Sequence, residues 1–132
     1  MKQSSTLSGN LLLRRVISYG YVAAVLGATL APLSADAYAA VAGLDKLVHV
    51  VLFGGVAVLL CWTANSVSPQ SARRVFLTTT AFAAIIELVQ SLLVYRSGDV
   101  WDLVAGSIGA VLGILFARAI AKFWVKKRAE SL

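Results

Sequence analysis

Three small groups of polar residues stand out in an otherwise apolar chain. Residues three or four apart are neighbours on a helix surface, so each group could share one helix face. The groups are Asp45 with His49, Glu87 with Gln90, and Arg96 with Asp99 and Asp102. Proteins use such carboxylates, imidazoles and guanidinium groups to transfer protons and to bind phosphates or metal ions.

The first two groups suggest acid–base chemistry. Asp45 precedes His49, the one histidine of the chain, by four residues and could orient it as a general acid or base. Glu87 could shuttle a proton, and Gln90 would lie on the same face of its helix. We therefore regard Asp45, His49 and Glu87 as candidate catalytic residues and Gln90 as a candidate ligand-binding residue.

The third group suggests binding of an anionic ligand. Arg96 could hold a phosphate through charge-assisted hydrogen bonds. Asp99 and Asp102 could bind a divalent cation that bridges to the phosphate, because hard cations prefer oxygen ligands. We expect all three residues to contact the ligand, and the need for a cation stays open.

These residues also have simpler interpretations. Asp45 and Asp99 could be helix N-caps, and Asp102 could complement the helix dipole from the first turn. His49 could be hydrogen-bonded to Asp45 and serve packing alone, and Arg96 could be an anchor at a membrane surface.

Glu87 is harder to explain without a function. At about 1.5 Å per residue it would lie roughly 12 Å below the end of a helix that ends near residue 95. Charged side chains near the middle of a bilayer cost about 2.5–3.5 kcal/mol on insertion scales. Glu87 therefore needs water or a partner inside the protein, which His49 or Arg96 could provide.

Four long apolar runs must position these groups. With 132 residues, of which 59% are hydrophobic and 14% charged, the chain is too apolar for a soluble domain of its size. We predict one all-α integral membrane domain over residues 1–132, with four transmembrane helices in an up-down bundle. The predicted helices cover residues 16–32, 45–64, 69–95 and 100–125, and Ser68 before Pro69 resembles a helix start.

The basic residues predict the orientation of this domain. All of them except Lys46 and Arg96 lie near the chain ends or, as Arg73 and Arg74, in the middle gap. The positive-inside rule then places both termini in the cytoplasm and the three polar groups outside. Basic residues that flank apolar runs indicate membrane lipids as partners and argue against nucleic acid.

The N-terminal segment has a second interpretation. Basic residues, an apolar stretch and Ala35-Asp36-Ala37 also fit a cleavable signal peptide. The apolar stretch reaches the upper limit of a signal h-region, about 7–15 residues, so we expect the segment to be retained as the first helix.

Gly109 and Gly113 form a GxxxG pair in the last apolar run. Such a pair permits close approach of two helix backbones. We favour packing within the bundle, and a homo-oligomer through the same pair is the alternative.

Three motifs in order give the chain a family resemblance. They are Asp45-Lys46-Leu47-Val48-His49, Glu87-Leu88-Val89-Gln90 and Arg96-Ser97-Gly98-Asp99-Val100-Trp101-Asp102. They resemble the D-K-x-x-H, E-x-x-Q and R-x-x-D-x-x-D motifs of the VanZ-like family, across roughly residues 16–120. The resemblance implies a small multi-helix protein of the bacterial cytoplasmic (inner) membrane. It also implies a link to antibiotic resistance, because the founding member is associated with low-level teicoplanin resistance.

Two main classes of function remain open from the sequence, and a transporter is a weaker third because four helices are few unless the protein oligomerises. One is an enzyme or head-group site that acts on a phosphate-bearing envelope lipid or cell-wall precursor, with a possible link to glycopeptide susceptibility. The other is a non-enzymatic protein whose polar cluster stabilises the bundle or docks a partner. No motif for a known hydrolase or phosphate loop is present to name a reaction.

Overall fold

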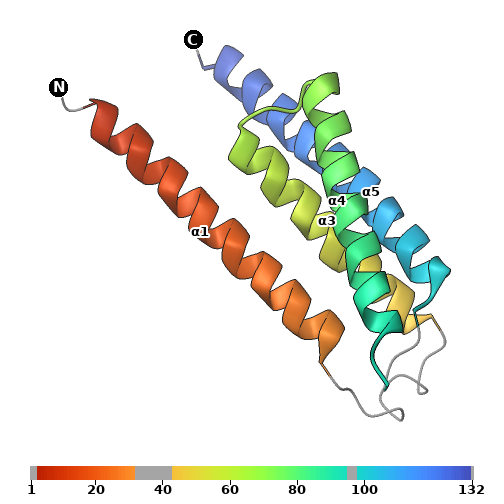
Figure 1. Cartoon of the computed structure of the whole chain (residues 1–132). Helices are drawn as coiled ribbons and strands as arrows, with labels where there is room; N and C mark the ends of the chain where they lie inside the picture. The colour runs from red at the N-terminus through yellow and green to blue at the C-terminus, as the bar shows by residue number, and fades with distance from the viewer. Residues whose placement is uncertain (1–2, 32–42, 95–97, 132) are drawn as a thin grey trace.

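The computed structural model describes residues 3–31, 43–94 and 98–131 of the chain. These parts form four α-helices, in agreement with the predicted all-α class (Figure 1). They are α1 (Gln3–Leu30), α3 (Leu44–Ala64), α4 (Pro69–Ser91) and α5 (Val100–Ala129).

Three stretches of helix are long and apolar enough to cross a membrane. They are Asn10–Leu30 in α1, Leu44–Ala64 in α3 and Val100–Ala129 in α5. We predicted four such helices, but α4 is not among those found in the described residues. The sequence of α4 includes Arg73, Arg74 and Glu87, which lower its mean hydropathy. Length and composition therefore indicate a membrane protein and leave the crossing of α4 unassigned.

Several helix ends differ from the predicted ones. Helix α1 begins at Gln3 instead of near residue 16, because no proline or other break separates the polar start from the apolar run. Helix α4 ends at Ser91, with Leu92 as its C-cap, instead of near residue 95. Glu87 therefore lies about one turn from the end of α4, roughly 6 Å along the axis, and not at the predicted depth.

The helix starts show which capping predictions hold. The hydroxyl of Ser68 accepts a hydrogen bond from the Ser71 N–H at 3.2 Å, with Pro69 at the first helical position. Asp99 caps α5 by accepting from the Trp101 N–H at 2.9 Å. The same interpretation of Asp45 is wrong, because α3 is preceded by Gly43 with φ of 85° and Asp45 lies in the first turn.

Glycines set the close contact between α3 and α5. A Cβ atom at Gly109 would collide with the carbonyl oxygen of Val50, and one at Gly113 with that of Gly54. Within this chain the GxxxG pair thus serves packing of α5 against α3, since only hydrogen atoms fit between the two backbones.

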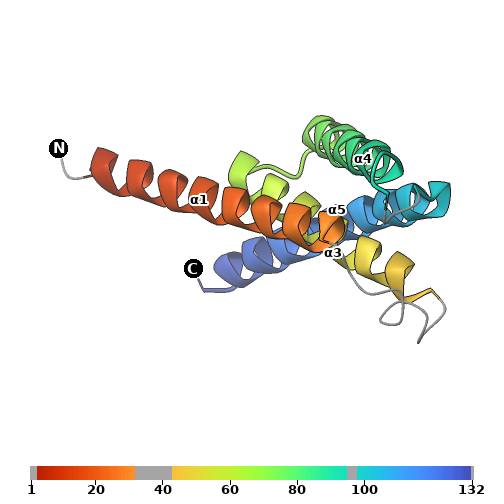
Figure 2. The same cartoon turned by 60° about the horizontal axis from the view of Figure 1, so that its bottom comes forward.

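The remaining helices complete the packing around this pair. Helix α4 packs against both α3 and α5, whereas α1 packs mainly along α3 (Figures 1 and 2). Phe53 of α3, Ala83 and Ile86 of α4 and Val25 of α1 form one buried apolar cluster. Figure 1 shows both chain termini at one end of the molecule and the starts of α3 and α5 at the other. Of the polar residues singled out in the sequence, Asp45, Asp99 and Asp102 lie at these two helix starts, and His49 lies one turn further along α3.

Candidate functional site

Lys46 lies at the centre of three carboxylates. Its Nζ atom is 3.0 Å from Asp45 Oδ2, 3.0 Å from Asp99 Oδ2 and 3.4 Å from Asp102 Oδ1. The start of α3 supplies Lys46 and Asp45, and the start of α5 supplies the other two carboxylates. The contact between these helices therefore assembles this part of the site.

His49 lies one turn deeper in α3 and is 4% exposed. Its Nδ1 atom is 2.9 Å from the main-chain oxygen of Asp45. We had expected the carboxylate of Asp45 to orient the ring, but the backbone does so and the carboxylate pairs with Lys46. Because a carbonyl oxygen can only accept, Nδ1 carries the proton in this bond and Nε2 is left for another partner.

Glu87 faces His49 from α4. Its Oε1 atom is 3.5 Å from His49 Nε2, and its Oε2 atom accepts a hydrogen bond from the Asp99 N–H at 2.9 Å. His49 Nε2 and Glu87 Oε1 are both buried and have no hydrogen-bond partner among the described residues. The sequence predicted that Glu87 needs a partner inside the protein. Its side chain contacts two groups, the His49 ring and the Asp99 N–H at the start of α5.

Asp102 joins the two parts of the cluster. It is 7% exposed, and its Oδ2 atom lies 3.9 Å from His49 Nδ1 while Oδ1 faces Lys46. The polar cluster, as we call it from here on, comprises six residues from three helices: Asp45, Lys46, His49, Glu87, Asp99 and Asp102.

Gln90 serves a different contact. It is 2% exposed, and its Nε2 atom donates a hydrogen bond of 2.7 Å to the main-chain oxygen of Thr29 in α1. The predicted ligand-binding residue therefore connects α4 to the end of α1. Arg96, the remaining candidate, lies outside the described residues, as does the possible cleavage site at residues 35–37.

Lys46 is the site residue that the sequence interpretation missed. Two signals were present, since it occupies the second position of the D-K-x-x-H motif and is a basic residue in an acidic gap. A lysine beside an aspartate at a helix end is an ordinary surface feature, so neither signal alone identifies Lys46 as a site residue.

The cluster carries an excess of negative charge. The cluster contains four carboxyl groups, and Lys46 is the one permanent cation in the described part of the site. The N–H of Trp101 and the ammonium of Lys46 lower the pKa of the Asp99 carboxyl, which therefore stays ionised at neutral pH. An added cation is favoured in such a site, whereas a free anion is repelled by the carboxylates.

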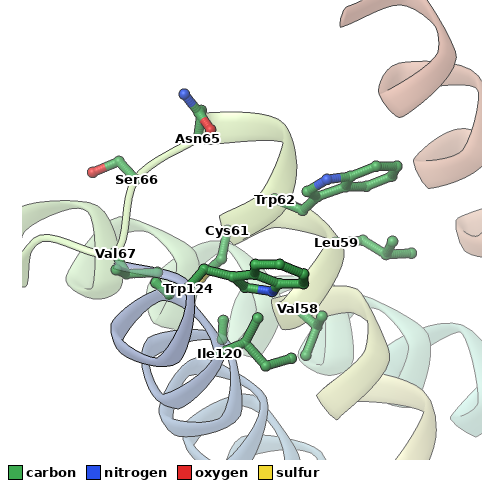
Figure 3. A pocket seen from close by; sticks show the side chains of 11 residues that line it. Val58, Leu59, Cys61, Trp62, Asn65, Ser66, Val67, Ile120 and Trp124 are labelled. Atoms are coloured by element: carbon green, nitrogen blue, oxygen red, sulfur yellow. The ribbon is translucent and has the colours of Figure 1, made fainter. Parts of the chain in front are cut away.

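An apolar groove at the other end of the molecule carries no such groups. It has a volume of about 540 Å³ and lies between the C-terminal parts of α3 and α5. Figure 3 shows Trp62, Trp124, Val58 and Ile120 among its lining residues. This lining suits an acyl chain and offers neither a carboxylate nor an imidazole, so the polar cluster remains the candidate for chemistry.

The helices and the cluster together define a helical membrane protein with a buried ionisable site. The family model VanZ/LLP1 matches residues 3–122, and the chain belongs to this family, which confirms the family resemblance seen in the sequence. No curated protein and no solved structure matches the chain.

Proposed function

We propose that the protein crosses the bacterial cytoplasmic membrane four times, with both termini in the cytoplasm and the polar cluster near the outer surface. The position of both termini at the end opposite the cluster supports this topology (Figure 1). A crossing by α4 is supported by the way its polar residues are used. Glu87 and Gln90 lie against α3, α5 and α1, which spares them contact with lipid.

We further propose that the polar cluster binds the head group of a phosphate-bearing envelope lipid or cell-wall precursor. One observation carries this proposal, namely that His49 Nε2 and Glu87 Oε1 are buried, face each other and lack hydrogen-bond partners among the described residues. Buried polar atoms normally have hydrogen-bond partners, so two buried atoms without such partners in a charged cluster support a ligand-binding site. A link to glycopeptide susceptibility would follow if that ligand is a cell-wall precursor.

Cationic side chains would receive the phosphate. The side chain of Lys46 is 39% exposed and can turn from the carboxylates toward a ligand, and Arg96 is close in sequence to Asp99. His49 and Glu87 are then placed to exchange a proton with a bound head group. Whether the protein turns over its ligand or only binds it depends on this last step.

Lipid extraction from the purified protein, followed by mass spectrometry, tests the proposal. We expect phosphate-bearing lipids to be enriched over the bulk membrane, and Lys46→Gln to reduce that enrichment. Lys122→Gln is the matched control, because it removes the same charge from an exposed position at the other end of the molecule. Equal lipid profiles for wild type and both variants would contradict the proposal.

A purely structural role is the second candidate, and a specific observation favours it. The Glu87 carboxylate accepts from the Asp99 N–H, and Gln90 donates to the Thr29 oxygen, so polar side chains connect three helix ends. In that case, loss of any cellular function in cluster variants would follow loss of folded protein. The variants described in the Discussion separate the two outcomes.

A further inference from the structure

We infer that His49, Glu87 and Asp102 form a binding site for a divalent transition-metal ion. The inference rests on the proposed function, since it describes how the same cluster would take a phosphate. It differs from the cation site that the sequence suggested, which used Asp99 and Asp102.

The distances between the candidate ligand atoms fit a metal ion. One atom from each of His49, Glu87 and Asp102 can be chosen so that all three lie within 4.8 Å of one another. His49 Nε2 and Glu87 Oε1 are 3.5 Å apart. Two ligand atoms about 2.0–2.2 Å from a tetrahedral ion are themselves separated by roughly 3.4 Å.

Each of the three side chains is held through its second polar atom. His49 Nδ1 donates to the Asp45 main-chain oxygen, Glu87 Oε2 accepts from the Asp99 N–H, and Asp102 Oδ1 faces the ammonium of Lys46. Of the other atoms, His49 Nε2 and Glu87 Oε1 face each other at 3.5 Å, and Asp102 Oδ2 lies 3.9 Å from the same imidazole ring. Metal-binding histidines usually donate their second ring N–H to a carbonyl or carboxylate, which fixes the lone pair toward the metal.

The unpaired imidazole nitrogen is the independent indication of a ligand. His49 is 4% exposed, and its Nε2 atom has no hydrogen-bond partner in the described parts of the chain. With the proton on Nδ1 and none shared with Glu87, Nε2 directs a lone pair at a carboxylate oxygen, an arrangement that a cation between the two atoms would stabilise. A metal ion would relieve this repulsion and also offset the excess negative charge.

The ligand types narrow the choice of metal. One imidazole and two carboxylates favour Zn²⁺ or Mn²⁺, whereas Mg²⁺ and Ca²⁺ prefer oxygen ligands alone. Three protein ligands leave a coordination position for water or for an oxygen of a bound phosphate. The neighbouring group of Asp45, Asp99 and Asp102 is a weaker candidate, because the Lys46 ammonium already lies among its oxygens.

Zinc titration of the purified full-length protein tests the inference. The affinity tag is cleaved off, bound metal is removed with a chelator, and Zn²⁺ affinity is measured calorimetrically without added lipid. We expect one high-affinity site, weakened at least about 10-fold by His49→Asn, Glu87→Gln or Asp102→Asn, since even losses of supporting partners cost 10–100-fold. Glu130→Gln is the matched control, because it removes a carboxylate whose side chain is 64% exposed at the other end of the molecule, and it should retain near wild-type affinity.

Circular dichroism and gel filtration check that each variant is folded, and Co²⁺ absorption spectra supply a second measurement. We expect visible bands of a Co²⁺–imidazole site in wild type and their loss in His49→Asn. Absence of a stoichiometric site in folded wild type, or equal affinities in all variants, would overturn the inference. In that event the imidazole and Glu87 carboxyl would share a proton instead. Lipid enrichment that survives metal removal would leave the proposed function standing without the metal.

Discussion

At the scale of single residues, the two carboxylate oxygens of Glu87 make different contacts. One carboxylate oxygen is fixed by the Asp99 N–H, and the other faces the buried His49 ring at 3.5 Å. The first oxygen contributes to the structure by closing the start of α5 onto α4. The second oxygen, Oε1, has no hydrogen-bond partner within the described residues. A substitution that keeps the first contact can therefore test the role of the second oxygen.

Replacing Glu87 with Gln should separate these two tasks. The amide oxygen can still accept from the Asp99 N–H, and the amide nitrogen can donate to His49 Nε2, so the melting temperature should stay the same or rise. Enrichment of phosphate-bearing lipid should be lost, because the amide can neither exchange a proton with the head group nor serve as a charged ligand for a cation that bridges to the phosphate. Thermal melts in detergent and lipid analysis of the same preparations give both results.

Glu130→Gln provides the control for this variant. It removes a carboxylate whose side chain is 64% exposed at the other end of the molecule, where we expect neither property to change. Normal lipid enrichment in a folded Glu87→Gln protein would exclude the proposed role of the carboxylate.

Asp99 likewise combines a structural and an electrostatic role. Its Oδ1 atom caps α5 through the Trp101 N–H, and its Oδ2 atom contacts Lys46 at 3.0 Å. Asp99→Ala removes both and should lower the free energy of unfolding by about 0.5–2 kcal/mol, as the loss of an N-cap does. Asp99→Asn keeps a capping side chain and should recover most of that loss, which reversible unfolding in mild detergent can measure.

Function should respond differently to the same two substitutions. If Lys46 must be held beside Asp99, both variants lose lipid enrichment although one of them remains stable. Recovery of function in step with stability in Asp99→Asn would favour the structural role of the cluster.

At the scale of helices, the sequence predicted the starts of α4 and α5 better than their ends. Ser68 with Pro69 and Asp99 each carry a local capping signal, and α4 and α5 begin there as expected. No comparable signal marks the end of α4. Leu92, Leu93 and Val94 continue the apolar run, so hydropathy extended the predicted helix beyond Ser91 and placed Glu87 too deep.

For the site, the sequence predicted which residues lie close together along a helix but not which of their atoms make contacts. Helical spacing placed Asp45 near His49 and Glu87 near Gln90, but spacing cannot show which atom of a residue makes a contact. The pairing of the Asp45 carboxylate with Lys46, and of Gln90 with the main chain of Thr29, depends on how helices distant in sequence pack. Such contacts become visible only in three dimensions.

The glycine contact between α3 and α5 can be tested with a matched pair of substitutions. Gly109→Ala would push a methyl group against the Val50 carbonyl, and we expect a loss of about 1–3 kcal/mol from overpacking. Gly27→Ala in α1 has no atom within 4 Å of the new Cβ and should be neutral or stabilising by up to about 1 kcal/mol. Unfolding in denaturant measures both, and equal effects would show that the contact does not limit stability.

At the scale of the whole molecule, the position of α4 decides the topology. Within the described residues, three helices are long and apolar enough to cross a membrane, and an odd number of crossings would place the two termini on opposite sides. A crossing by α4 as well would place them together, as the positive-inside rule requires.

Cysteine labelling at the two ends of α4 decides between these topologies. In a Cys61→Ser background, Gln70→Cys lies at the start of α4 and Val94→Cys lies beyond its end, and both positions are exposed. We expect a membrane-impermeant maleimide to label Val94→Cys in intact cells and Gln70→Cys only after permeabilisation. Labelling of both from one side would show that α4 does not cross.

The separation of acidic and basic ends also has an electrical consequence. In an energised bacterium the cytoplasm is negative, so the membrane voltage draws the basic end inward and drives the negatively charged cluster outward. Each elementary charge moved across the membrane is worth about 2.3 kcal/mol per 100 mV. With the proposed orientation, a living cell therefore opposes inversion of this protein more strongly than a de-energised vesicle does, and the voltage itself helps to keep the cluster on the outer side.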